Sequence, residues 1–244
     1  MDRVAGWDAG AAWWQREYTD GADVEYEEQI IPLVVEQLRG TRRVLDIGCG
    51  EGQVARRLAA AGVEVIGLDP SGPQIARAHE RGGGPCFTRS SAEQLPVADR
   101  CLDAVLACLA FEHVHDMPAA VREIARVLVP GGLLVLLVGH PLLQAPGSGW
   151  IDDKILDERY WRIGEYLREH AVLDEVAPGI SFEFIHRPVF VYVNTLAEHG
   201  LFVEHMEEPA PPPALLDEVW GYPEAATIPR ILVLRCVFQG PMDR

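Results

Sequence analysis

The stretch Val44-Leu45-Asp46-Ile47-Gly48-Cys49-Gly50-Glu51-Gly52 decides the fold, because an apolar run ends there in glycines at alternate positions. This pattern predicts a buried strand that stops in a tight turn. The helix formers after Gln53 predict a helix, which Gly62 ends. Glycine tolerates positive φ and has no Cβ, so we expect the backbone N–H groups of the turn to lie close to a nucleotide-like ligand at the start of this helix.

An acidic residue, Asp69, follows the turn at the spacing that is typical of nucleoside-binding α/β sheets. A second strand is predicted over residues 63–68, and Asp69 stands at its end, about 20 residues after the turn. An acid at this place in an open α/β sheet can accept hydrogen bonds from both hydroxyls of a ribose. Each of these charge-assisted bonds would contribute about 1.5–3 kcal/mol. Together, the turn and Asp69 predict a nucleoside site.

The turn follows the pattern D-x-G-x-G-x-G, whereas dinucleotide enzymes usually carry GxGxxG. It resembles the first motif of the class I methyltransferases, a Rossmann-like family that binds S-adenosylmethionine (SAM). Residues 99–108 resemble the fourth strand of that family, and residues 128–134 resemble its L-x-P-G-G-x-L turn into the fifth strand. The chain is most similar to the small-molecule, type 11-like methyltransferases. The resemblance implies SAM as the cofactor and S-adenosylhomocysteine (SAH) as its product.

The resemblance also implies an α/β fold. We expect a seven-stranded, mostly parallel sheet with helices on both faces, whose last strand is antiparallel and inserts between strands five and six. The expected parts are a helical cap (1–40), a SAM-binding core (41–140), an insertion or lid that forms the acceptor pocket (141–187), and a helix with strands six and seven (188–244). Residues 160–167 of the insertion suggest a helix or lid.

The cofactor-binding residues are predicted partly from the resemblance and partly from a general rule. Open α/β sheets bind ligands at the carboxyl ends of their strands. Small residues such as Ala92 would admit the adenine ring, and Ser71 with Gln74 also predicts a capping box at a helix start. The predicted residues are Tyr18, Asp46, Gly48, Cys49, Gly50, Gly52, Asp69, Pro70, Ser71, Gln74, Ser91, Ala92, Glu93, Cys108, Leu109 and His113.

Methyl transfer from a sulfonium needs little acid–base catalysis, because the thioether leaves as a neutral group. Catalysis then depends mainly on holding the acceptor in line with the methyl carbon. An oxygen or carbon acceptor also requires removal of a proton, for which a neutral histidine is suitable. His140, at the end of the fifth predicted strand, is the first candidate, followed by His113 and His186.

The charge and residue composition of the chain limit which kinds of binding partner are expected. The net charge of −16, without a cluster of Lys and Arg, argues against a nucleic-acid partner, so a small-molecule acceptor is expected. The longest apolar run, residues 133–138, is too short to span a membrane. The five cysteines form no CxxC pair, and no apolar signal segment is expected at the start of the chain. These features favour a reducing cytoplasm and argue against a zinc site.

Two alternatives to a methyltransferase stay open. The first is an NAD(P)-dependent oxidoreductase on the same layered fold, which the missing GxGxxG disfavours. The second is a SAM-binding regulatory subunit without catalysis. The identity of the acceptor atom and the oligomeric state do not follow from the sequence.

Overall fold

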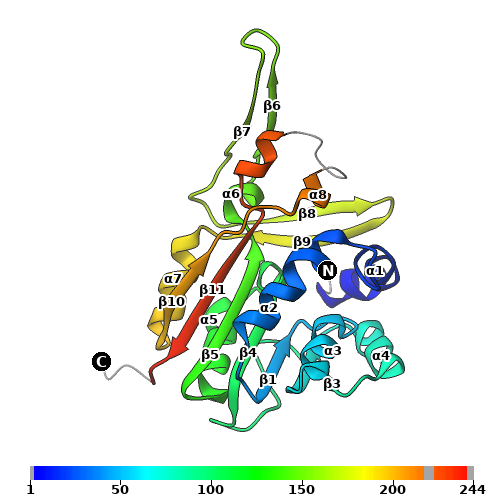
Figure 1. Cartoon of the computed structure of the whole chain (residues 1–244), viewed down its shortest axis with the longest axis vertical. Helices are drawn as coiled ribbons and strands as arrows, with labels where there is room; N and C mark the ends of the chain where they lie inside the picture. Colours follow the sequence, from blue (N-terminus) through cyan, green and yellow to red (C-terminus); the bar gives the residue numbers. More distant parts are fainter. Residues whose placement is uncertain (1–2, 217–222, 241–244) are drawn as a thin grey trace.

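The computed structural model describes residues 3–216 and 223–240. Figure 1 shows a central sheet with helices on both sides and a long hairpin that projects from one end. The predicted ranges 1–40 and 188–244 include residues 1–2, 217–222 and 241–244, which lie outside the described residues.

The central sheet has seven strands in the order β10-β11-β5-β4-β1-β2-β3. β11 is antiparallel to both β5 and β10, whereas the other neighbours are parallel. The predicted seven-stranded α/β fold and the antiparallel last strand are therefore confirmed. The strands are β1 (Arg43–Ile47), β2 (Glu64–Asp69), β3 (Cys86–Arg89), β4 (Leu102–Cys108), β5 (Leu128–Gly139), β10 (Leu201–Glu207) and β11 (Ile231–Phe238).

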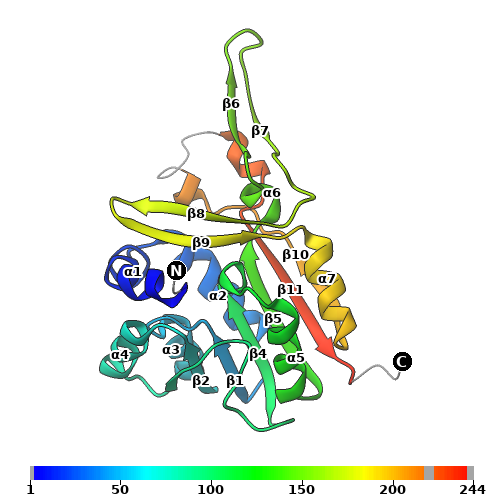
Figure 2. The same ribbon diagram turned by 180° about the vertical axis from the view of Figure 1, so that it is seen from behind.

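Helices cover both faces of the sheet because side chains alternate along each strand. Val44 of β1 belongs to a buried cluster with residues of α2, α3 and α4, whereas Leu45 and Ile47 belong to a second cluster with residues of α5 and α7. Figure 2 shows α5 and α7 from the opposite side. The helices are α2 (Ile31–Gln37), α3 (Gln53–Ala60), α4 (Gly72–Arg81), α5 (Met117–Val127) and α7 (Val189–Glu198).

The insertion after β5 forms two hairpins. In the first, β6 (Gly149–Asp153) pairs with β7 (Glu158–Arg162), and this is the hairpin that projects in Figure 1. The sequence predicts a helix or lid over residues 160–167, and the helix is wrong, because Tyr160 and Trp161 pair across the hairpin with Ile151 and Trp150. Aromatic and β-branched residues fit such a pleated ribbon.

The second hairpin joins the insertion to the N-terminal helix. β8 (His170–Ala177) pairs with β9 (Ile180–His186), and β9 packs against α1 (Arg3–Tyr18). Both views show α1 beside β9 and above α3 and α4. The remaining short elements are η1 (Tyr26–Ile30), η2 (Phe111–His113), α6 (Pro141–Gln144), α8 (Pro213–Leu215) and η4 (Pro223–Thr227).

Neither a membrane-spanning helix nor a metal-binding cluster is found in the part of the chain that the structure describes. Among the described residues, no helix combines the length and the apolar character that crossing a bilayer requires. Within the same residues, no group of three or more His, Cys, Asp or Glu side chains is arranged to hold a metal ion.

Candidate functional site

A cavity of about 290 Å³ lies at the carboxyl ends of β1, β2 and β4. The glycine turn after β1 forms part of its wall, and residues of α1 line it as well. Most of the predicted site residues meet here although they come from distant parts of the sequence. The predicted residues that line the cavity are Tyr18, Asp46, Gly48, Cys49, Gly50, Asp69, Pro70, Gln74, Ser91, Ala92, Glu93, Cys108, Leu109 and His113.

Four predicted residues lie outside the cavity lining: Gly52, Ser71, His140 and His186. Gly52 is the N-cap residue of α3, where it adopts a φ of 85°. Ser71 occupies the N-cap position of α4, but its hydroxyl is buried without a hydrogen-bond partner. The predicted capping box is therefore wrong. Gln74 instead accepts a hydrogen bond of 2.9 Å from the side chain of Gln15, because α1 packs against α4.

The glycine turn contributes space rather than free donors. The N–H groups of Gly48 and Cys49 donate to the Leu68 carbonyl at 2.8 and 2.9 Å. Gly50 donates to Asp69 at 2.9 Å. Gly48, Cys49 and Gly50 line the cavity, so the expectation that the turn lies close to a ligand stays a prediction, although these three N–H groups already have acceptors within the protein. Gly48 has a φ of 73°, and a Cβ there would lie 2.5 Å from the Cβ of Ala110.

Asp69 is fixed by two backbone donors. Its Oδ2 accepts from the N–H of Gly50 at 2.9 Å, and its Oδ1 accepts from the N–H of Ser71 at 2.8 Å. Burial raises the pKa of this carboxyl to about 6, although the two hydrogen bonds favour the ionised form. Each carboxylate oxygen keeps a further lone pair, so Asp69 can accept hydrogen bonds from two adjacent hydroxyl groups.

The buried carboxyl group of Asp46 indicates the charge of the ligand that the cavity can bind. Its Oδ2 is buried and has no hydrogen-bond partner, and burial together with the charge of Asp69 raises its pKa to about 8. Glu93 also lines the cavity, as does Glu51, whose carboxylate is paired with Arg56 and Arg81. Among the described residues, no lysine or arginine belongs to the lining. Such a site stabilises a positively charged ligand and destabilises a phosphate-bearing one. These residues therefore fit SAM, which carries a sulfonium and an ammonium group.

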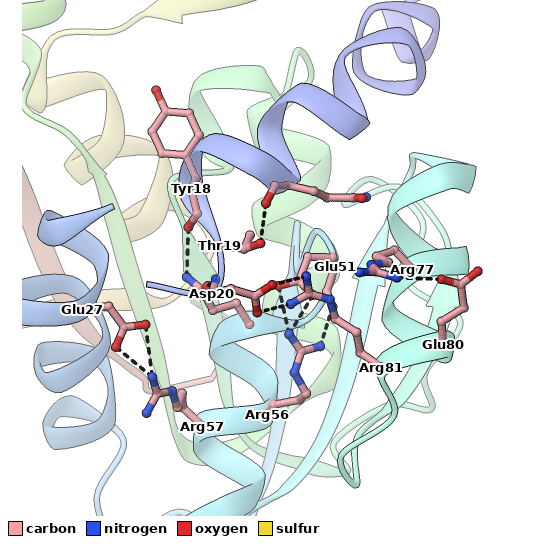
Figure 3. Close-up of polar contacts among 12 residues, drawn as sticks. Tyr18, Thr19, Asp20, Glu27, Glu51, Arg56, Arg57, Arg77, Glu80 and Arg81 are labelled. Carbon is pink, nitrogen blue, oxygen red and sulfur yellow. Dashed lines mark hydrogen bonds and ion pairs between the residues drawn. The ribbon is translucent and has the colours of Figure 1, made fainter. Parts of the chain in front are cut away.

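The N-terminal segment is attached to the glycine turn by the network in Figure 3. The Gln53 side chain donates to the Tyr18 carbonyl at 3.3 Å and accepts from the Asp20 N–H at 3.1 Å. Arg81 binds both carboxylate oxygens of Asp20, at 2.5 and 2.6 Å, and lies 3.0 Å from the buried Glu51 carboxylate. This network keeps Tyr18 over the cavity.

His113 is the one predicted histidine in the lining. Its Nδ1 lies 2.7 Å from the carbonyl oxygen of Glu183, so Nδ1 carries the proton and Nε2 does not. The rings of Trp7 and Phe184 contact it at centroid distances of 4.7 Å. Burial lowers the pKa of His113 to about 4, so that it stays neutral at physiological pH.

The other two histidines are engaged elsewhere. His140 is 1% exposed; its Nε2 lies 2.8 Å from Glu208, and its Nδ1 accepts from the Leu142 N–H at 3.2 Å. It caps the short helix α6. His186 ends β9, where its Nε2 lies 2.8 Å from the Tyr166 carbonyl. The structure thus does not bring His140 or His186 into the cavity.

Sequence reasoning missed several lining residues. His115 follows His113 by two positions and also lines the cavity, with its Nε2 2.7 Å from Glu183. The spacing of the two histidines after the fourth strand was an available signal. Trp7 and Thr19 gave no such signal, because α1 reaches the cavity only through tertiary packing.

Comparisons with known proteins agree on one family. A family model described as a methyltransferase domain matches residues 45–136. A crystal structure of a SAM-dependent methyltransferase from Mesorhizobium loti is 30% identical with a TM-score of 0.73, and the match covers 88% of this chain and 98% of that one.

Two curated relatives match over shorter stretches. A demethylmenaquinone methyltransferase from Thermus thermophilus is 36% identical over 127 residues, which are 50% of this chain and 57% of the relative. A 27-O-demethylrifamycin SV methyltransferase from Amycolatopsis mediterranei is 37% identical over 145 residues, which are 57% of this chain and 52% of the relative. The chain therefore spans little more than half the length of these two proteins.

Proposed function

Because the chain belongs to the class I SAM-dependent methyltransferases, we propose that it transfers the methyl group of SAM to a small-molecule acceptor. The observation that carries this proposal is the cavity at the ends of β1, β2 and β4. Within the part of the chain that the structure describes, its lining includes carboxylates and neither lysine nor arginine. Carboxylates stabilise a sulfonium and an ammonium group, whereas they repel the pyrophosphate of a dinucleotide. This charge favours a methyltransferase over an oxidoreductase.

When bound, SAM supplies a methyl carbon on a positively charged sulfur, which leaves as a neutral thioether. Asp69 would accept the ribose hydroxyls, Asp46 would face the cationic part, and Ala92 would leave room for the adenine. Residues of α1 and of the loop after β4 would enclose the acceptor and exclude water. Orientation of this kind can supply as much as ~7–11 kcal/mol of a reaction barrier.

The acceptor class is supported by the relatives. Their names refer to demethylmenaquinone and to demethylrifamycin, both small molecules, which supports a small-molecule acceptor for this chain. The charge of −16 disfavours nucleic acid as the acceptor. Because the five cysteines are scattered and form no CxxC pair, we still predict a cytoplasmic location.

Calorimetry with SAH and with NADH, followed by incubation with methyl-labelled SAM and a metabolite extract, tests the proposal. We expect SAH to bind, NADH not to bind, and a labelled small molecule to form. Binding of NADH without SAH would establish the oxidoreductase alternative. Binding of SAH without a labelled product from any acceptor would instead indicate a regulatory subunit.

A further inference from the structure

Glu183 of β9 contacts two histidines of the loop that follows β4. Its backbone carbonyl oxygen lies 2.7 Å from Nδ1 of His113, and its carboxylate Oε2 lies 2.7 Å from Nε2 of His115. Both histidines line the cavity. A single residue of the insertion therefore orients two imidazoles at the end of the central sheet.

The same loop is also held by Arg187. This guanidinium is buried; its Nη1 donates to the Phe111 carbonyl at 2.9 Å, and its Nη2 donates to the Val114 carbonyl at 2.7 Å. An ion pair of 3.4 Å with Glu169 balances its charge. Because Arg187 and Glu183 are close in sequence and both bind this loop, the insertion fixes where the imidazole of His115 lies.

A small hollow beside the main cavity contains these groups. Gly6, Trp7, His113, His115, Phe182 and Glu183 line it, and three of them, Trp7, His113 and His115, also line the main cavity. The rings of Trp7 and Phe182 stack at a centroid distance of 4.1 Å. The hollow has a volume of about 30 Å³, which is room for roughly one or two waters and not for an aromatic ring. Trp7 and His115 also line the main cavity of about 290 Å³, where Trp14, Tyr18 and Tyr26 add further rings. Aromatic walls favour flat aromatic ligands.

The two histidines differ in their ability to accept a proton. His113 is enclosed by aromatic rings, and burial lowers its pKa to about 4, so it accepts a proton poorly at neutral pH. His115 places Nε2 2.7 Å from a carboxylate oxygen and donates to it, which leaves Nδ1 as the acceptor atom. The side chains of His115 and Glu183 are 27% and 38% exposed, so the proton can pass on to water.

We propose that the acceptor is an aromatic compound with a hydroxyl group, which binds in the main cavity beside Trp7 and gives its proton to His115, with Glu183 as the positioning residue. This inference rests on the proposed methyltransferase function. In the step, the O–H bond breaks, its electron pair stays on oxygen, and the proton binds Nδ1 of His115 before it leaves to water. The oxygen is then the nucleophile.

The ionisation of para-nitrophenol tests this step without any cofactor, because the phenolate absorbs where the phenol does not. The wild-type protein should bind the probe with a raised phenolate fraction. His115→Asn and Glu183→Gln should each abolish this rise, and Glu183→Gln keeps the backbone carbonyl that binds His113. His205→Asn is a matched control, since His205 lies 3.7 Å from Glu207 on β10 in a similar pair.

Turnover provides the second measurement. With methyl-labelled SAM and a panel of phenols, His115→Asn should lower kcat at least ~100-fold, as loss of a general base does. The affinity for SAH should stay within about twofold of the wild type. Wild-type phenolate spectra in both variants, or methylation of amines alone, would overturn the inference while SAH still binds. If SAH bound to none of the proteins, the proposed function itself would fail.

Discussion

The Asp69→Asn substitution removes one charge and one hydrogen-bond acceptor from the site while the size of the side chain stays the same. In the structure the two carboxylate oxygens accept from the backbone N–H groups of Gly50 and Ser71, at 2.9 and 2.8 Å. Asparagine has a single acceptor oxygen. One backbone donor therefore loses its partner, and one ribose hydroxyl loses a charged acceptor.

The expected loss of affinity follows from these contacts. A hydrogen bond to a charged group contributes about 1.5–3 kcal/mol, and each 1.4 kcal/mol is about tenfold in affinity. We expect SAH to bind roughly 10- to 150-fold more weakly at about pH 8, where a carboxyl with a pKa of about 6 is ionised. Calorimetry measures this, with the circular dichroism spectrum as a check of folding. Asp174→Asn, at an exposed position of β8, makes the same change of charge and should leave the affinity unchanged.

Adenosine and dideoxyadenosine separate the ribose contact from other effects of the substitution. The wild-type protein should prefer adenosine, and this preference should shrink in Asp69→Asn by the factor lost for SAH. If the folded variant binds SAH as tightly as the wild type, Asp69 does not hold the ribose. The same conclusion follows if the variant keeps the full preference for adenosine.

Three further predictions concern other parts of the site. The pKa of Asp46 is raised from 3.8 to about 8 mainly by burial. The native state then binds more protons than the unfolded chain between these values, so the stability of the ligand-free protein should fall as pH rises through this window. Asp46→Asn should flatten that slope in thermal denaturation, and an unchanged slope would contradict the shift. Asp20→Asn removes the ion pair with Arg81. Because the Asp20 side chain is 69% exposed, the loss should be small, and SAH dissociation should become about 1.5- to 5-fold faster in stopped-flow measurements. A rate unaffected by this change would mean that the network in Figure 3 does not hold the N-terminal segment over the ligand. Gly48→Ala should lower the free energy of unfolding by about 1–3 kcal/mol more than Gly179→Ala, because both have φ above 70° but only Gly48 would clash with a neighbour. Urea denaturation measures both, and equal losses would show that the clash with Ala110 is relieved.

Much of the fold was predictable because its signals are local. The apolar run of β1, the glycines after it and the acid at the end of β2 each depend on residues that are neighbours in sequence. The order of these segments and the turn into β5 carry the resemblance to the class I methyltransferases, and this resemblance implied the layered α/β sheet. Asp69 was predictable for the same reason, since the end of a parallel strand places it at the ligand edge.

Tertiary contacts decided the remaining features. The amides of the glycine turn are used by Leu68 and Asp69, which only the pairing of β1 with β2 brings within reach. The segment 160–167 begins in strand β7, which ends at Arg162, and not in a helix, because its aromatic residues pair across the hairpin with Ile151 and Trp150.

The sequence by itself determined the sheet, the glycine turn and the position of Asp69, since hydrophobic periodicity and turn chemistry act over a few residues. Only the tertiary structure decided which histidine faces the cavity. Glu183 lies 70 residues from His113 in sequence, yet it orients this histidine and His115, while His140 is held by Glu208. Such choices depend on hydrogen bonds between distant segments, and these form only when the insertion packs over the end of the sheet.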